Sequence, residues 1–139
     1  MPDDGLVSLR SAHSAEDTIA RVEADLAAKG VTLFAKIDHA AGAAAAGLAL
    51  RPTTLLVFGS ARAGTPLMQA CQRIGIDLPL RALVWEAGDG AVWFTYNDPA
   101  WVARRHVPDP QSEPLVHAMS AMLDAIARYG TAADPASSA

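Results

Sequence analysis

Residues 80–96 read LRALVWEAGDGAVWFTY, two apolar runs on either side of a glycine-rich turn. Gly88-Asp89-Gly90 is typical of a tight β-hairpin turn, because glycine adopts the positive φ values that such turns need. Side chains from Ala91 to Tyr96 should then alternate between the two faces of a strand. Trp85 and Trp93 lie on the two arms, where we expect them to pack or to form an interface. The hairpin thus predicts an antiparallel pair of strands.

Similar signals punctuate the rest of the chain. Strands are expected at residues 5–10, 31–37 and 53–59, and helices at 15–29, 40–48, 67–74 and after Ser112. Ser14, three residues before Asp17, is typical of a helix N-cap. Thr65-Pro66 is typical of an N-cap followed by proline in the first turn. The order β-α-β-α-β-α-β-β-α predicts a two-layer α+β domain, with a mixed or antiparallel sheet and helices packed on it.

Composition narrows the possible partners and compartments. The 139 residues suit a single domain, which we expect at 1–130 with a disordered tail at 131–139. The net charge is −4 and the basic residues are scattered along the sequence, which argues against nucleic acid. The single cysteine, Cys71, excludes an internal disulfide. The longest apolar stretch, 40–50, is too short to cross a bilayer. With no visible secretory signal, we expect a cytoplasmic protein without membrane contact.

Short motifs in a fixed order point to a known family. They are Asp17-Thr18-Ile19, Ile37-Asp38-His39-Ala40, Gly47-Leu48, Arg51-Pro52-Thr53, Leu56-Val57-Phe58-Gly59, Ala63-Gly64-Thr65-Pro66-Leu67-Met68, Asp77-Leu78-Pro79-Leu80 and Tyr96-Asn97-Asp98-Pro99. With this order and spacing, the chain resembles the DUF302 family of small bacterial and archaeal domains from about Gly5 to Ala127. The resemblance implies a compact α+β fold and a homodimer, and it supplies no reaction. Ser60-Ala61-Arg62 departs from the asparagine-like turn that the family has after Gly59.

Asp38 and His39 stand at the end of an expected strand, where two readings are open. A histidine titrates near neutral pH, so the two side chains could act as an acid/base pair. Adjacent residues point in different directions, however, and a direct relay between them is not assured. The simpler interpretation is that Asp38 caps the following alanine-rich helix while His39 bonds a backbone carbonyl, and we favour it.

The segment from Gly59 to Thr65 joins a buried strand to a helix and has the glycine spacing of a phosphate-binding loop. It lacks the lysine that would neutralise phosphate, and Pro66 removes a backbone donor. Nucleotide binding is therefore disfavoured. A small anion beside Arg62 is more plausible, and an ordinary capped turn is favoured over both.

Other candidate residues follow further along the chain. Met68 and Cys71 are three apart on one helix face and, with His39, would offer a soft metal site. Both are also ordinary core residues, and the ligand number is too low for a strong prediction. Asp77 and Tyr96 could each face a pocket. The remaining histidines are expected to be solvated: His13, His106 and His117.

Three functional hypotheses remain. The first is a small soluble domain that works as a homodimer and binds a small ligand without a cofactor. Its expected ligand-binding residues are His39, Met68, Asp77, Tyr96 and Arg62. The second is an enzyme with His39 as general base, assisted by Asp38 or Tyr96. The third is a metal-handling protein that uses His39, Met68 and Cys71.

Overall fold

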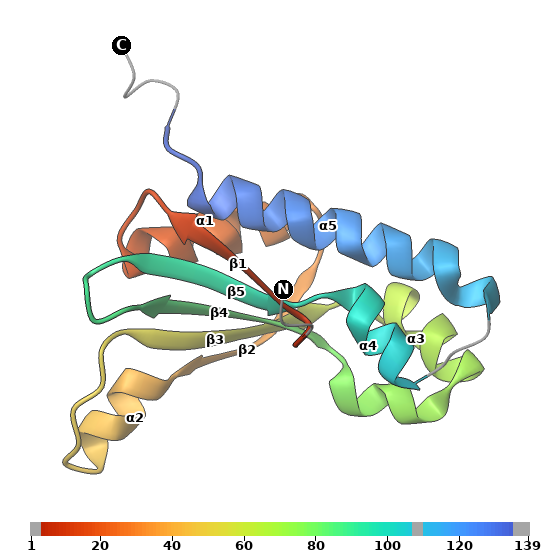
Figure 1. Ribbon diagram of the computed structural model, residues 1–139, viewed down its shortest axis with the longest axis horizontal. Coiled ribbons are helices and arrows are strands. Elements are labelled where there is room, and N and C mark those ends of the chain that lie inside the picture. Colours follow the sequence, from red (N-terminus) through yellow and green to blue (C-terminus); the bar gives the residue numbers. More distant parts are fainter. Residues whose placement is uncertain (1–3, 107–109, 135–139) are drawn as a thin grey trace.

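The computed structural model describes residues 4–106 and 110–134 of the chain (Figure 1). The strands are β1 (Leu6–Ser11), β2 (Thr32–Asp38), β3 (Thr53–Gly59), β4 (Leu80–Glu86) and β5 (Val92–Asn97). The α-helices are α1 (Ala15–Ala28), α2 (His39–Ala45), α3 (Ala61–Ala70), α4 (Pro99–His106) and α5 (Glu113–Thr131). Two short 3-10 helices complete the description: η1 (Gln72–Asp77) and η2 (Pro110–Ser112).

The sheet has the strand order β1-β5-β4-β3-β2, and each neighbouring pair is antiparallel. The predicted α+β fold is therefore confirmed, with the antiparallel form of the two sheet types that the sequence left open. The expected hairpin joins β4 to β5 and pairs Trp85 with Trp93. Thr95 links three strands on the same face, since its hydroxyl lies 2.8 Å from Ser8 Oγ and accepts a hydrogen bond from Trp85 Nε1.

The main hydrophobic core lies between the other face of the sheet and the helix pair α1 and α5, which run beside each other in Figure 1. Alternation along each strand sends every second side chain into this layer. Its fully buried members include Leu56, Phe58, Val84 and Phe94 from the sheet, and Val22, Leu26, Leu123 and Ile126 from the helices. The structure is thus a two-layer sandwich with helices on one face.

A second, smaller cluster lies at the end of the sheet where α3, η1 and α4 gather (Figure 1). Its buried residues are Leu67, Ile74, Val102, Val116 and Met119. Helix α2 stands at the opposite end of the molecule, and none of its residues is buried. Within the described residues, no helix combines the length and the apolar character needed to span a membrane.

The N-terminal ends of the helices can be compared with the capping residues predicted from the sequence. Ser14 Oγ accepts a hydrogen bond from the Asp17 backbone N–H, as predicted. The predicted start at Thr65-Pro66 is wrong, because α3 begins five residues earlier, behind Ser60, whose Oγ accepts from the Ala63 N–H. Cys71 is extended, with φ −151°, and so the helix expected at 67–74 is split between α3 and η1.

The end of α5 lies next to the boundary expected at residue 130. Thr131 is buried at the end of α5, and its carbonyl accepts a hydrogen bond from the Ala12 N–H. Asp134 forms an ion pair with Arg21. Helix α5 thus ends one residue inside the expected tail, residues 132–134 after it are exposed, and residues 135–139 lie outside the described part of the structure.

Candidate functional site

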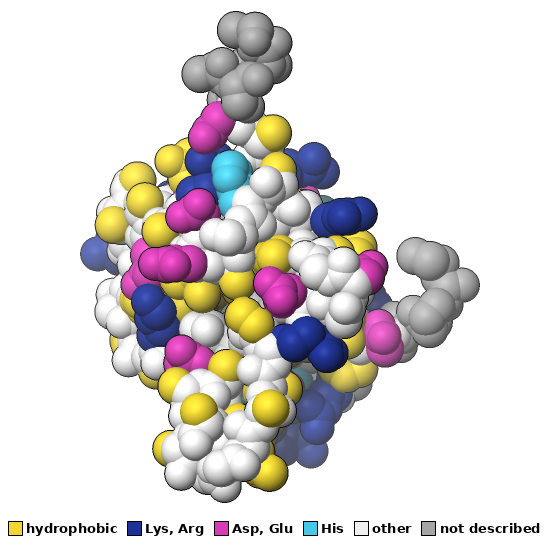
Figure 2. All heavy atoms as spheres, turned by 90° about the vertical axis from the view of Figure 1, so that its left-hand side faces the viewer, with side chains coloured by type: hydrophobic (Ala, Val, Ile, Leu, Met, Phe, Trp, Pro, Cys, Tyr) yellow, Lys and Arg dark blue, Asp and Glu magenta, His cyan; other side chains and the backbone are white. Residues whose placement is uncertain are grey.

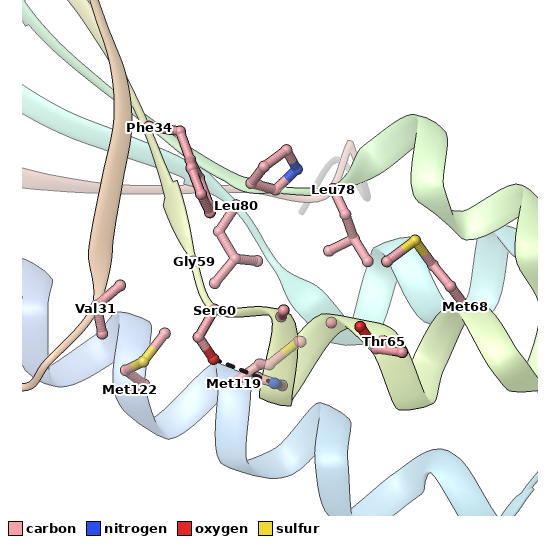
Figure 3. A pocket seen from close by; sticks show the side chains of 14 residues that line it. Val31, Phe34, Gly59, Ser60, Thr65, Met68, Leu78, Leu80, Met119 and Met122 are labelled. Carbon is pink, nitrogen blue, oxygen red and sulfur yellow. Dashed lines mark hydrogen bonds between the residues drawn. The ribbon is translucent and has the colours of Figure 1, made fainter.

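An apolar pocket of about 240 Å³ opens where β2, β3, α3 and α5 meet (Figure 3). Apolar side chains form most of its wall: Val31, Phe34, Met68, Leu78, Leu80, Met119 and Met122. Every residue that lines it is uncharged. The flexible and polarisable methionines allow such a wall to adapt to differently shaped apolar groups. The pocket can therefore hold an apolar group, but its wall offers no titratable group for proton transfer.

The backbone shapes the mouth of this pocket. The register of β2 against β3 shifts between Leu33 and Ala35, and such an irregularity re-aims the intervening side chain. That side chain is Phe34, which is 55% exposed and reaches the pocket mouth. Ser60 supplies a hydroxyl, but its Oγ already caps α3 (dashed line in Figure 3). The lining is therefore mainly apolar, and Ser60 and Thr65 supply its side-chain hydroxyls.

A separate polar contact joins η1 to α4. His106 Nε2 lies 2.5 Å from Asp77 Oδ2, and Arg105 Nη1 donates to both carboxylate oxygens of Asp77 at 3.2 Å. Cys71 Sγ lies 3.7 Å from the His106 carbonyl oxygen. His106 is only 7% exposed, and so the prediction that it is solvated is wrong. It is buried because the last turn of α4 packs against η1.

The other two histidines differ from each other. His13 Nε2 lies 2.7 Å from the Ala132 carbonyl oxygen, so its ring is half-buried and bonded rather than simply solvated. His117 is exposed on α5, as predicted.

The simpler interpretation of Asp38 and His39 is confirmed for Asp38. Asp38 Oδ1 accepts from the Ala41 N–H and caps α2. His39 is exposed at the first position of this helix. Helix α2 lies at the opposite end of the molecule from α3, which carries Met68 (Figure 1). The structure therefore does not bring His39 and Met68 into one pocket.

The remaining expected ligand-binding residues are also dispersed. Met68 lines the apolar pocket, whereas Asp77 belongs to the polar contact between η1 and α4. Arg62 is exposed on α3 and does not line the pocket. Among the described residues, no group of three or more His, Cys, Asp or Glu side chains is placed to hold a metal. The expected set of His39, Met68 and Cys71 is not assembled either, because α2, which begins with His39, lies far from α3, which carries Met68.

Tyr96 lies in the core of the sheet, where its ring meets Phe94 edge-on at 5.9 Å between centroids. Burial raises the pKa of Tyr96, and the negative charges of Asp124 and Asp98 raise it further. The hydroxyl therefore stays protonated at neutral pH and cannot accept a proton as a base.

Sequence reasoning missed most of the pocket wall. Met119 and Met122 lie at helical spacing with Leu123 and Ile126 on α5, a pattern that indicates core residues, yet both reach the pocket. Phe34 falls in the strand expected at residues 31–37, and the sequence pattern does not distinguish it from its neighbours. The strand irregularity beside it leaves no recognisable local signal in the sequence.

Comparison with known proteins identifies relatives of this chain. The family model described as "Domain of unknown function DUF302" matches residues 7–128. The chain is 47% identical over 127 residues to "Fluoride-specific ion channel FluC 1" of Brucella suis, covering 91% of this chain and 50% of that protein. It is equally similar to "Fluoride-specific ion channel FluC 2" of Brucella melitensis, covering 91% of this chain and 47% of that protein. The chain thus spans about half the length of these curated relatives.

A solved structure supports the fold. The "uncharacterized conserved protein DUF302 from Bacillus stearothermophilus" superposes with a TM-score of 0.81 and covers 91% of this chain and 98% of its own. Its sequence identity is only 16%, and the similarity therefore concerns the fold alone.

These comparisons correct the functional expectation. The family and the α+β fold are confirmed. The prediction of a small cytoplasmic domain that binds a small ligand is wrong, because the relatives that match 91% of the chain are named as fluoride-specific ion channels. Of the residues of the two alternatives, Asp38 and His39 lie together at the start of α2, whereas Tyr96 is on β5 and Met68 is on α3.

Proposed function

We propose that this chain, which belongs to the DUF302 family, works as the accessory domain of a fluoride-specific ion channel. The observation that carries the proposal is the extent of the match. Nearly all of this chain, 91%, is 47% identical to about half of a protein named as such a channel. The shared half contains the DUF302 region, since the family model matches residues 7–128 of this chain. We assign the ion pathway to the other half of those relatives.

The packing of the helices supports the assignment of the ion pathway to the other half. The apolar sides of α1 and α5 are used in the core, where Val22, Leu26 and Ile126 are fully buried against the sheet. The outer side of α5 carries charged residues, among them the ion pair of Asp124 and Arg128. Amphipathic helices that bury their apolar side in this way stabilise a folded domain of their own.

The proposal is tested in a bacterial host that lacks its own fluoride channel and is therefore sensitive to fluoride. The full Brucella suis relative is compared with a version shortened by the half that matches this chain. The shortened version is also produced together with this chain as a separate polypeptide. Immunoblots of the membrane fraction confirm equal amounts of the shortened protein in both strains.

We expect the shortened relative to give weaker growth in fluoride and this chain to restore part of the loss. Full protection by the shortened relative would contradict the proposal, because the matched half would then be dispensable. Protection by this chain alone would also contradict it, since the ion pathway would then not lie in the other half.

A further inference from the structure

We propose that the end of the molecule formed by η1 and the last turn of α4 docks on a membrane surface that carries anionic lipids. This inference rests on the proposed function, because it concerns how an accessory domain would sit beside a channel. It names a surface and a partner chemistry that the channel assignment does not include. It also reverses the expectation, drawn from the sequence, that the chain has no membrane contact.

The structure gathers arginines that are dispersed in the sequence. Arg73, Ile76, Arg105 and His106 line one open hollow on the surface. Arg81 joins them, since its Nη2 donates a hydrogen bond to the Ile76 carbonyl oxygen at 3.1 Å. We call Arg73, Arg81 and Arg105 the arginine cluster. Its members come from η1, β4 and α4, and so no basic stripe is visible in the linear sequence.

The arginine cluster keeps an excess of positive charge. Asp77 is the carboxylate bonded within it, and it contacts Arg105 and His106. The bond from Arg81 goes to a backbone carbonyl, which is neutral and does not cancel the charge of the guanidinium. Among the described residues of the cluster and its bonded partner Asp77, three arginines stand against one carboxylate, and this positive excess is the sign that attracts anionic lipid headgroups.

An exposed apolar side chain stands among these charges. Ile76 is 68% exposed, and it shares the hollow with Arg73 and Arg105. The chain then runs from η1 to Leu78 and Pro79, which line the apolar pocket. Basic side chains around exposed apolar ones suit the interface between lipid headgroups and acyl chains.

The overall negative charge of the chain does not cancel this attraction. Figure 2 shows acidic side chains together with basic ones at the opposite end of the molecule, while Glu113 begins α5 at the same end as α4. Helix α5 has 19 residues and extends about 28 Å between the two ends. Charges are screened over about 8 Å at physiological ionic strength. A membrane at the arginine cluster therefore meets the local positive charge.

The test measures co-sedimentation of the full chain with lipid vesicles. One set contains phosphatidylcholine alone, and the other contains phosphatidylcholine mixed with phosphatidylglycerol. We expect binding to the mixed vesicles, weakened by added salt, and little binding to the neutral ones. Arg73→Gln should lower the partition coefficient about fivefold, the effect of one basic residue at an anionic surface. Ile76→Ser should lower it as well.

Arg10→Gln is the matched control, because it removes the same charge from β1, outside the arginine cluster. It should leave binding within about twofold of the unchanged chain. Thermal unfolding of each variant checks that the fold is kept. No binding to the mixed vesicles would overturn the inference, as would equal binding to both sets or an equal loss in Arg10→Gln.

A protein partner is the competing occupant of this surface. The chain could fail to bind vesicles and instead bind the other half of the Brucella suis relative. If Arg73→Gln abolishes that binding, the membrane inference is overturned. The proposed function would then stand, since the growth experiment tests it separately. Conversely, the chain could bind the mixed vesicles and yet fail to restore growth in fluoride when it is produced with the shortened relative. That result would support the membrane-docking surface and overturn the channel proposal.

Discussion

Asp77 Oδ2 lies 2.5 Å from His106 Nε2, and this contact joins the end of η1 to the last turn of α4. The residues are separated by 29 positions in the sequence, yet both are largely shielded from solvent. The polar contact thus ties together the two segments that carry most of the arginine cluster.

Replacement of Asp77 should measure the strength of this tie. Asp77→Ala leaves a buried imidazole nitrogen without its partner and should lower the free energy of unfolding by about 1–3 kcal/mol. Glu23→Ala is the control, because Glu23 pairs with Lys36 in a half-exposed bridge that contributes at most about 1 kcal/mol. Urea unfolding followed by tryptophan fluorescence measures both. Equal losses in the two variants would show that the Asp77 contact stabilises no more than a surface pair does.

Gly130 should tolerate no side chain where α5 crosses α1. A Cβ at this position would lie 2.5 Å from Val22 Cγ2, and Val22 is fully buried. Gly130→Ala should therefore destabilise by about 1–3 kcal/mol through overpacking, and adding Val22→Ala should cost less than the sum of the two changes. Thermal or urea unfolding gives the values.

Gly42→Ala is the same chemical change as Gly130→Ala, but we expect it to stabilise the protein. Nothing lies within 4 Å of a Cβ at Gly42 in α2, so alanine should stabilise by about 0.5–1 kcal/mol through its helix propensity. If Gly130→Ala proved as favourable as Gly42→Ala, the close approach of the two helices would be refuted.

Tyr96 should make stability depend on alkaline pH. Burial, and then the charges of Asp124 and Asp98, raise its pKa above the ordinary value of about 10.0. Above pH 10 the unfolded chain loses this proton while the folded chain keeps it, and so the free energy of unfolding falls as pH rises. Tyr96→Phe should remove this contribution and flatten the slope. An unchanged slope in the variant would assign the alkaline loss to other groups.

The homodimer stays a prediction. Trp85 and Trp93 pair across the hairpin on the sheet face opposite α1 and α5, where both are half-buried. If this face meets a second copy, Trp93→Glu should yield a monomer, because an unpaired charge would be buried in the interface. Light scattering at micromolar concentration measures the mass. A monomeric mass for the unchanged chain would sink the prediction.

Local signals were enough for most of the fold. The Gly88-Asp89-Gly90 turn and the cap at Ser14 involve residues within a few positions of each other, and the structure confirms both. The start of α3 was missed because two capping signals compete in one segment. Ser60, not Thr65, is the N-cap of α3, and Pro66 lies inside the helix.

The candidate sites depend on contacts that no local pattern encodes. Phe34 reaches the pocket mouth only because β2 shifts its register against β3. His106 is buried only because Asp77 lies on a segment that folds back against α4. Asp38 and His39 are adjacent in the sequence, which suggests an acid/base pair, whereas in the structure Asp38 caps α2 and His39 is exposed.

The most direct test of the channel assignment is fluoride flux through a reconstituted membrane. The half of the Brucella suis relative that this chain does not match is placed in lipid vesicles loaded with fluoride, and a fluoride electrode follows release as this chain is added. We predict that the chain alone releases no fluoride, and that it changes the release rate of the channel half until a saturating concentration is reached. A release rate that stays constant at every concentration of the chain would contradict the account.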